Sequence, residues 1–223
     1  MTVNDVYKIV LYAASKNLQQ GYISPDDFNL VINQAQTSFQ DYLLGEFQQY
    51  RPFQPVSRVG YSNNETTRQR LQPLIYWYTL NVDTIGFAPY PGDYQQTDAM
   101  LSIYGNNRIR FSQQDKLFSL YNSKIDPYQT NPFYLIENKG FRFYPNDINQ
   151  TRLSYVRTAP KIVWAYTLDV NGVPVYDPVN SVNPVWYDVD ILEIIARALR
   201  IIGVNLQSNV ISQYANEIKT QGQ

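Results

Sequence analysis

The stretch that most constrains the fold runs from residue 131 to residue 160 and reads NPFYLIENKGFRFYPNDINQTRLSYVRTAP. Aromatic and β-branched runs at 133–137 and 141–144 flank a three-residue loop, in which Gly140 can supply the positive φ of a tight hairpin. Pro145 has no N–H for a sheet ladder, so the second strand ends there. The pattern therefore predicts a β-hairpin at this point in the chain.

A third strand follows at residues 152–157, where apolar and polar side chains alternate up to a break at Pro160. Leu153 and Tyr155 share one face of this strand, which makes that face the drier one. We therefore expect three successive antiparallel strands whose dry face is covered by helices.

The composition excludes much of ordinary catalysis. The 223 residues include no cysteine and no histidine, which removes thiol nucleophiles, imidazole bases, disulfides and the commonest zinc ligands. Charges are sparse and balanced, with 18 basic and 19 acidic residues, so a cationic nucleic-acid binder is not expected. The 20 tyrosines fit half-buried protein interfaces, although a biased coding composition would explain them equally well.

Helices are predicted at both ends of the chain. Residues 2–20 form an amphipathic pattern that Thr2 and Asp5 can cap, and a second helix starts at Ser24, with Pro25 in its first position. The second helix carries an apolar stripe with Asn and Gln on the opposite face. Near the C-terminus, Asp188 or Asp190 is expected to cap a helix that ends before Gly203, and a last helix is expected at about residues 208–219.

Between these helices we expect a loop-rich part followed by a strand-rich part. Residues 51–64 and 85–98 are punctuated by proline and glycine and are interpreted as arms, while 76–82 is expected to be a strand. Asn-Gly at 171–172 predicts a second hairpin. The fold class is thus α+β: one domain, 1–223, made of a helical hairpin (1–50), a loop-rich and arm-rich insertion (51–100), a β-rich part (101–185) and C-terminal helices (186–223).

No catalytic or metal-binding motif is found, so we expect no enzyme, no cofactor and no metal. Two carboxylate pairs lie where helix N-termini favour acids, and a third lies in a polar loop; these are Asp26 with Asp27, Asp188 with Asp190, and Asp93 with Asp98. Trp77, Trp164 and Trp186 can form a carbohydrate-binding surface, but core packing is the simpler interpretation. No uncharged apolar run approaches about 18 residues, so no membrane contact is expected.

Three stretches together resemble tailed-bacteriophage neck proteins, namely the head-to-tail adaptors of short-tailed phages and the ring proteins of crAss-like phages. They are SQQDKLFSLYNSKIDPYQTNP, FYLIENKGFRFYPNDINQTRLSYVRTAP and DVDILEIIARALRIIGVNL, and the resemblance covers roughly residues 110–218. It rests on the order of the segments, and the start of the second helix, GYISPDDFNLVINQAQ, is also similar to such virion proteins.

The resemblance implies a structural virion protein that assembles in the host bacterial cytoplasm. Its partners would be further copies of itself in a ring of about twelve, the portal protein and other neck or tail ring proteins, with DNA passing through the lumen without sequence-specific binding. We expect the two arms to make these contacts and the C-terminal helix to dock on a neighbouring ring. The candidate interface residues are Arg51, Phe53, Arg58, Tyr61, Phe87, Tyr90, Tyr94 and Tyr214.

Other functions stay open on the sequence alone. A head decoration or a tail-fibre attachment protein would show a different symmetry and no portal contact. A carbohydrate-binding or adhesin module would need exposed aromatic residues in a cleft. An enzyme is the weakest alternative, because it would need a site made of carboxylates alone.

Overall fold

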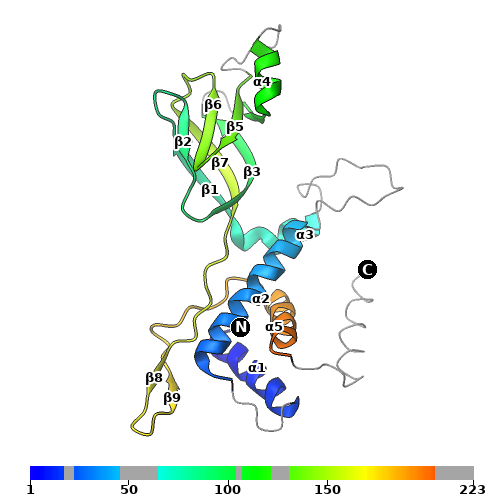
Figure 1. Cartoon of the computed structure of the whole chain (residues 1–223), viewed down its shortest axis with the longest axis vertical. Coiled ribbons are helices and arrows are strands. Elements are labelled where there is room, and N and C mark those ends of the chain that lie inside the picture. The colour runs from blue at the N-terminus through cyan, green and yellow to red at the C-terminus, as the bar shows by residue number, and fades with distance from the viewer. Residues whose placement is uncertain (18–22, 46–64, 104–106, 122–130, 204–223) are drawn as a thin grey trace, which may run out of the picture. The chain divides into compact units, whose positions relative to one another are not determined.

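A computed structural model describes residues 1–17, 23–45, 65–103, 107–121 and 131–203 of the chain (Figure 1). Helices come from both ends of the sequence and antiparallel sheets from its middle, so the α+β class is confirmed. We expected one domain in four parts, whereas the chain divides into two compact units. We call them the helical unit (Met1–Arg70 with Ala159–Gln223) and the β unit (Leu71–Thr158).

The helical unit is built on α1 (Val3–Asn17), α2 (Pro25–Gly45), α3 (Glu65–Leu71) and α5 (Asp188–Ile201). Both α1 and α2 pack against α5, as Figure 1 shows. The apolar stripe of each helix is buried as its periodicity predicts. Its fully buried members include Val3, Val10, Phe28, Ile32, Phe39, Leu43, Ile191, Ile194 and Ala198.

The starts of the first two helices follow the predicted capping chemistry. In α1, the backbone N–H of Asp5 donates to Thr2 Oγ1 at 3.2 Å, and the Thr2 N–H donates back to Asp5 Oδ2 at 3.1 Å. In α2, the N–H of Asp27 donates to Ser24 Oγ at 3.1 Å. These bonds satisfy N–H groups that have no partner inside the helix, and they fix where each helix begins.

The predicted cap of α5 is wrong. Tyr187 occupies the capping position and makes no side-chain cap bond, so neither Asp188 nor Asp190 has that role. Asp190 is instead buried, and its carboxylate accepts a hydrogen bond from the guanidinium of Arg70. Burial of an unpaired carboxylate costs more free energy than the loss of a side-chain helix cap, so the pairing of Asp190 with Arg70 is favoured over capping.

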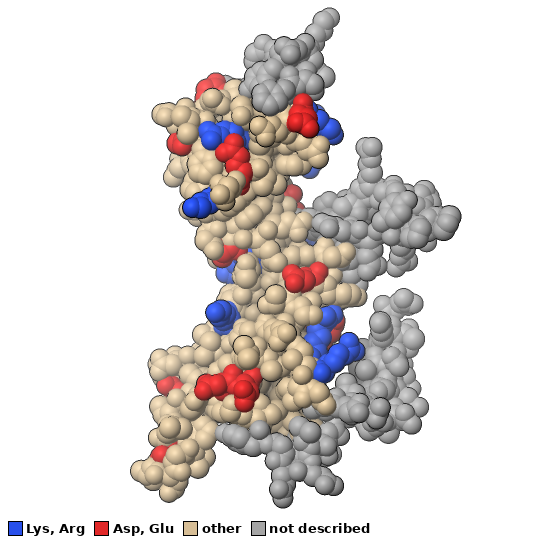
Figure 2. Space-filling model, in the orientation of Figure 1, with Lys and Arg blue, Asp and Glu red and all other residues tan. Residues whose placement is uncertain are grey.

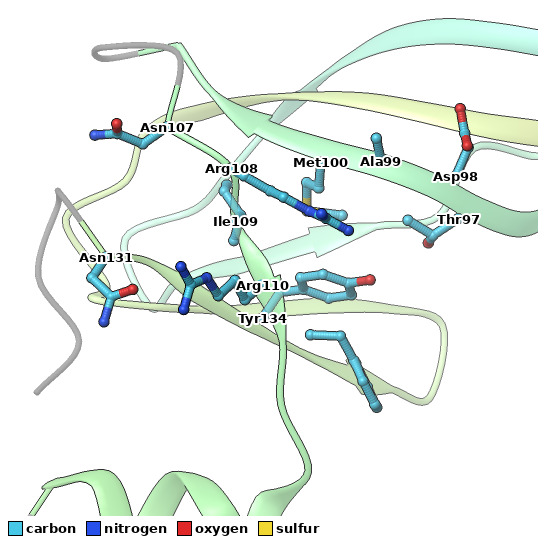
Figure 3. A pocket seen from close by; sticks show the side chains of 11 residues that line it. Thr97, Asp98, Ala99, Met100, Asn107, Arg108, Ile109, Arg110, Asn131 and Tyr134 are labelled. Atoms are coloured by element: carbon cyan, nitrogen blue, oxygen red, sulfur yellow. The ribbon is translucent and has the colours of Figure 1, made fainter. Parts of the chain in front are cut away.

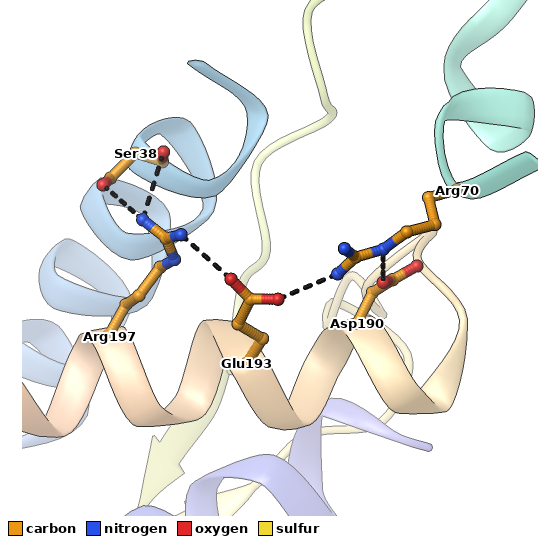
Figure 4. A network of polar contacts seen from close by, with 5 residues as sticks. All are labelled: Ser38, Arg70, Asp190, Glu193 and Arg197. Carbon is orange, nitrogen blue, oxygen red and sulfur yellow. Dashed lines mark hydrogen bonds and ion pairs between the residues drawn. The ribbon is translucent and has the colours of Figure 1, made fainter. Parts of the chain in front are cut away.

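This ion pair belongs to a wider network that joins α2, α3 and α5 (Figure 4). Arg70 donates to Asp190 at 2.7 Å and to Glu193 at 2.8 Å, and Arg197 donates to Glu193 at 2.9 Å and to Ser38 Oγ at 3.2 Å. Burial raises the pKa of Asp190 above its ordinary value, and the hydrogen bond and charge of Arg70 offset part of that rise. The network thus compensates the cost of one buried carboxylate.

The polar face of α2, with its Asn and Gln side chains, binds an extended segment of the same unit. Four amide side chains, spaced four, three and four residues apart, contact backbone groups of residues 159–164. The pairs are Asn29 with Trp164, Asn33 with Ile162, Gln36 with Pro160 and Gln40 with Ala159, at donor–acceptor distances from 2.7 to 3.1 Å. We call these four residues the amide ladder. It pairs backbone groups of Ala159, Pro160, Ile162 and Trp164, whereas Val163 between them forms a β-bridge with Val182.

The β unit contains two sheets. One has the order β1-β7-β3, all antiparallel, with β1 (Ile75–Asn81), β7 (Gln150–Arg157) and β3 (Tyr94–Ser102). The other has the order β2-β6-β5-β4, with β2 (Phe87–Pro89), β6 (Gly140–Tyr144), β5 (Phe133–Glu137) and β4 (Arg110–Phe111). Among the described strands, only β4 runs parallel to its neighbour, and α4 (Gln114–Tyr121) follows it.

The expected cover of helices over the dry face of the third strand is wrong. Leu153 and Tyr155 of β7 belong to a core cluster that includes Phe141 and Phe143 of the other sheet, so sheet packs on sheet (Figure 1). The third strand also does not extend the hairpin sheet, since β7 pairs with β1 and β3. Long-range pairing therefore decides the layer structure.

Residues 85–98, expected to be an arm, are part of this β unit. They contain β2 and the first half of β3, and the N–H of Phe143 donates to the carbonyl of Gly86 at 2.7 Å. The predicted strand at 76–82 is confirmed as β1, and the hairpin of β5 and β6 is confirmed as well.

The turn of this hairpin uses its residues differently from the prediction. Lys139, not Gly140, has the positive φ, at 70°. Gly140 is needed for space, because a Cβ there would lie 2.3 Å from the carbonyl oxygen of Ala88 and 2.5 Å from Phe87 Cζ. The glycine thus allows β2 to approach β6 closely.

Candidate interaction surfaces

Five of the eight predicted interface residues lie outside the described residues: Arg51, Phe53, Arg58, Tyr61 and Tyr214. The other three are partly buried in the β unit. The rings of Tyr90 and Tyr94 stack 4.6 Å apart, and the Tyr90 hydroxyl donates to the Glu137 carbonyl at 2.9 Å. The Arg142 guanidinium lies over the ring of Phe87, 5.5 Å from its centroid. Contacts within the unit therefore account for all three rings.

Two of the three tryptophans serve the core. Trp164 and Trp186 are buried, and their indole N–H groups donate to Asn4 and Gln36. Trp77 alone is exposed, at 50%. A binding platform built from all three tryptophans is thus wrong.

The candidate carboxylates have structural partners. Asp93 accepts a hydrogen bond from the Tyr155 hydroxyl at 2.8 Å, and Asp98 accepts one from Ser154 Oγ at 2.8 Å. Burial, together with the hydrogen bond and charge of Asp93, raises the pKa of Tyr155 to about 12. No group of three or more His, Cys, Asp or Glu that could hold a metal occurs in the described part of the chain.

The clearest surface that is not occupied by the unit's own contacts is the hairpin of β8 (Tyr166–Leu168) and β9 (Pro174–Tyr176), which sequence analysis predicted as a hairpin but not as a contact surface (Figure 1). Its base is anchored, because Trp164 stacks on Tyr166 and Tyr176. Beyond the base it is apolar and open to solvent, with Leu168 66% and Val170 96% exposed.

More apolar side chains of and beside this hairpin are also exposed. They are Val173, Val175 and Val179. A two-stranded hairpin is marginally stable in water unless it packs on something else. Within the described residues β8 pairs only with β9, so this hairpin presents an apolar surface with no cover of its own.

A second exposed surface lies on β1, the edge strand of the three-stranded sheet. Tyr76, Trp77 and Tyr78 are each about half exposed. The guanidinium of Arg157 lies 4.9 Å from the Tyr76 ring centroid, and that of Arg152 lies 5.3 Å from the Trp77 ring centroid. These contacts hold the rings in place at the surface.

Charge does not mark out a site on the face shown in Figure 2. Lysine and arginine alternate there with aspartate and glutamate, and uncharged residues cover most of the area between them. A continuous basic track for a nucleic acid would look different. This face therefore offers no continuous basic surface.

No protein-family profile matches the sequence, and no curated protein is significantly similar to it. Among the described helices, none combines the length and the apolar character needed to cross a bilayer.

Proposed function

We propose that this chain is a structural protein of the phage virion. In this proposal it forms a ring of about twelve copies in the neck, which connects the portal to the tail and surrounds the DNA channel. The role is mechanical rather than catalytic. The proposal rests on the resemblance of three segments to neck proteins and on the surfaces described above.

The observation that carries the proposal is the exposed apolar hairpin of β8 and β9. A ring subunit must offer a surface that a neighbouring copy covers, and Leu168, Val170 and Val175 provide one on an element with a fixed base. Because the contact is apolar, it does not depend on the few charges of this chain. The proposed occupant of the hairpin is the adjacent subunit of the ring.

Negative-stain electron microscopy tests the ring directly. The purified protein is imaged alone and mixed with the portal protein encoded by the same genome. Closed rings of about twelve copies, alone or on the portal, are the expected result. A persistent monomer that ignores the portal refutes the proposal, and particles of another symmetry on capsid or fibre indicate a head-decoration or tail-fibre role.

A variant of the hairpin tests the contact. The triple substitution Leu168→Thr, Val170→Thr and Val175→Thr removes exposed apolar surface and keeps residues that favour strands. We expect this variant to stay folded and to lose ring formation. The matched control, Leu30→Gln, Val189→Gln and Leu192→Gln, removes three exposed apolar side chains from helices of the same unit and should still form rings. If both variants form rings equally well, the hairpin is not part of the interface between subunits.

Carbohydrate binding is the second candidate, and the exposed rings of Tyr76, Trp77 and Tyr78 favour it. Trp77 fluorescence during titration with oligosaccharides measures it. Saturable binding that Trp77→Ala abolishes, without ring formation, would replace the neck role by an adhesin role.

A further inference from the structure

Two arginines lie side by side where the sheets of the β unit meet. Residue Arg108 bridges to Leu101 at the end of β3, and Arg110 pairs with Phe133 of β5, so residues 108–110 join the two sheets. Ile109 between them is buried, while both arginines are exposed. Because side chains alternate along an extended chain, Arg108 and Arg110 lie on the same side, with Cα atoms about 6–7 Å apart.

These two arginines differ from the others of the β unit. Arg142 pairs with Glu137, Arg152 covers the Trp77 ring and Arg157 covers the Tyr76 ring. Within the part of the chain that the structure describes, the side chains of Arg108 and Arg110 make neither a hydrogen bond nor an ion pair, although the Arg110 backbone N–H donates to the Pro132 carbonyl at 3.0 Å. Their guanidinium donors are therefore available to a ligand.

Both arginines line a hollow of about 660 Å³ (Figure 3). In Figure 3 the Arg110 guanidinium lies near Asn131, whereas the Arg108 guanidinium extends toward the ring of Tyr134. The two positive charges thus occupy different places along the hollow. A ligand with two separated negative groups fits this arrangement better than a single small anion does.

The surroundings favour carboxylates over a nucleic-acid backbone. The hollow also contains Asp98, and its other lining residues are uncharged, so no basic track continues beyond the two arginines. A nucleic acid would need such a track, whereas two carboxylates need only two guanidinium groups. In an extended peptide, the side chains of alternate residues point to one side, and their Cα atoms have the same spacing as the Cα atoms of Arg108 and Arg110.

We propose that this hollow binds an extended acidic segment of a protein, with the carboxylates of two alternate residues paired to Arg108 and Arg110. Asn107 and Asn131 line the same hollow and add amide donors for the carboxylates or the peptide backbone. The inference is independent of the ring proposal, since it needs only the β unit's own side chains.

Fluorescence anisotropy with the full chain tests this site. The probe is a fluorescein-labelled hexapeptide of alternating glutamate and threonine, in which threonine favours an extended chain. We expect saturable binding that weakens with added salt and at least about tenfold weaker binding when glutamine replaces glutamate. Equal binding of the two peptides, or no binding of either at millimolar concentration, overturns the proposal.

Variants locate the binding. The double variant Arg108→Gln, Arg110→Gln should weaken peptide binding at least about tenfold. The control variant Lys161→Gln, Arg200→Gln removes the same charge from exposed sites of the helical unit and should change peptide binding less than about twofold. Arg108→Lys with Arg110→Lys should bind between these limits, because lysine keeps the charge but not the planar fork. If the two double glutamine variants lose affinity for the peptide to a similar extent, the acidic-peptide site is refuted. It is also refuted if a thymidine oligonucleotide of equal length binds more tightly than the acidic peptide.

Discussion

Replacement of Asn33 by alanine tests whether the amide ladder holds the helical unit together. The side chain of Asn33 donates to the Ile162 carbonyl at 2.7 Å and accepts from the Ile162 N–H at 2.9 Å. Ile162 is 1% exposed, so water does not readily replace the lost partner. Asn33→Ala therefore removes these two hydrogen bonds, together with the one that Asn33 donates to the Asn29 carbonyl within the helix, and leaves a buried backbone N–H without an acceptor.

The magnitude follows from these contacts. Two net hydrogen bonds contribute about 2 kcal/mol, and an unsatisfied buried N–H adds about 1–3 kcal/mol. Alanine regains about 0.5 kcal/mol through its higher helix propensity. We expect Asn33→Ala to lower the free energy of unfolding of the helical unit by roughly 2.5–4.5 kcal/mol, which moves a urea midpoint by about 1 M or more.

Tryptophan fluorescence during urea denaturation measures this effect. Trp164 and Trp186 are buried in the helical unit, and a Trp77→Phe background removes the signal of the β unit. The control is Gln34→Ala, which changes an exposed amide one residue away on the same helix. If the two variants unfold within about 0.5 kcal/mol of each other, the ladder does not contribute to stability and the reasoning is refuted.

Two further substitutions test the β unit. Gly140→Ala should destabilise the β unit by about 2 kcal/mol or more, because the new Cβ meets the Ala88 carbonyl. Thermal unfolding followed by circular dichroism measures this effect, and Gly92→Ala, with no atom within 4 Å of its Cβ, is the control that should change little. Equal effects of the two substitutions would contradict the close approach of β2 to β6. The pKa of Tyr155 is about 12 in the folded protein and about 10 in the unfolded chain. Its protonated hydroxyl therefore contributes to the free energy of unfolding below pH 10, and this contribution is lost as the pH rises toward 12. Between pH 10 and pH 12 the free energy of unfolding of the wild type, measured by urea denaturation, should therefore fall by roughly 2–3 kcal/mol more than that of Tyr155→Phe. If the two proteins lose stability in parallel over this range, Tyr155 does not titrate as described.

Local chemistry made several elements predictable from the sequence. Thr2 and Ser24 cap their helices because a hydroxyl next to free N–H groups acts over a few residues only. The hairpin at Gly172 follows from the residues of the turn itself, where Gly172 has a φ of 74°. Each of these signals is complete within about five residues, so no distant partner can change it.

Long-range pairing was not predictable in the same way. The partners of β7 could not be found from its own alternation, since they lie far earlier in the sequence: Ser102 of β3 pairs with Thr151, and Ile75 of β1 pairs with Val156. Pro89 and Pro91 favoured a loop at 85–98, although Pro89 ends β2 at the edge of its sheet, where a missing N–H is tolerated. Tertiary pairing overrode local propensity here.

The candidate contact surface was only half predictable. The Asn-Gly pattern indicated the hairpin of β8 and β9, but its exposure depends on which parts of the fold lie beside it. Tyrosine content directed attention to Tyr90 and Tyr94, which turned out to pack within the β unit. Composition counts aromatic side chains without separating core rings from surface rings.

The amide ladder also shows one structural use of Asn and Gln in a chain with few charges. Amide side chains can donate and accept at once, so each matches a peptide group without the desolvation cost of an ion. Asp190 shows the alternative, since its single buried carboxylate requires Arg70 as a charged partner. Backbone groups of an extended segment that no β-ladder pairs, such as the N–H groups of Ile162 and Trp164, are held at lower cost by amides. Asn and Gln on the polar side of a helix, at the spacing of its turns, thus indicate a bound backbone segment as well as a solvated face.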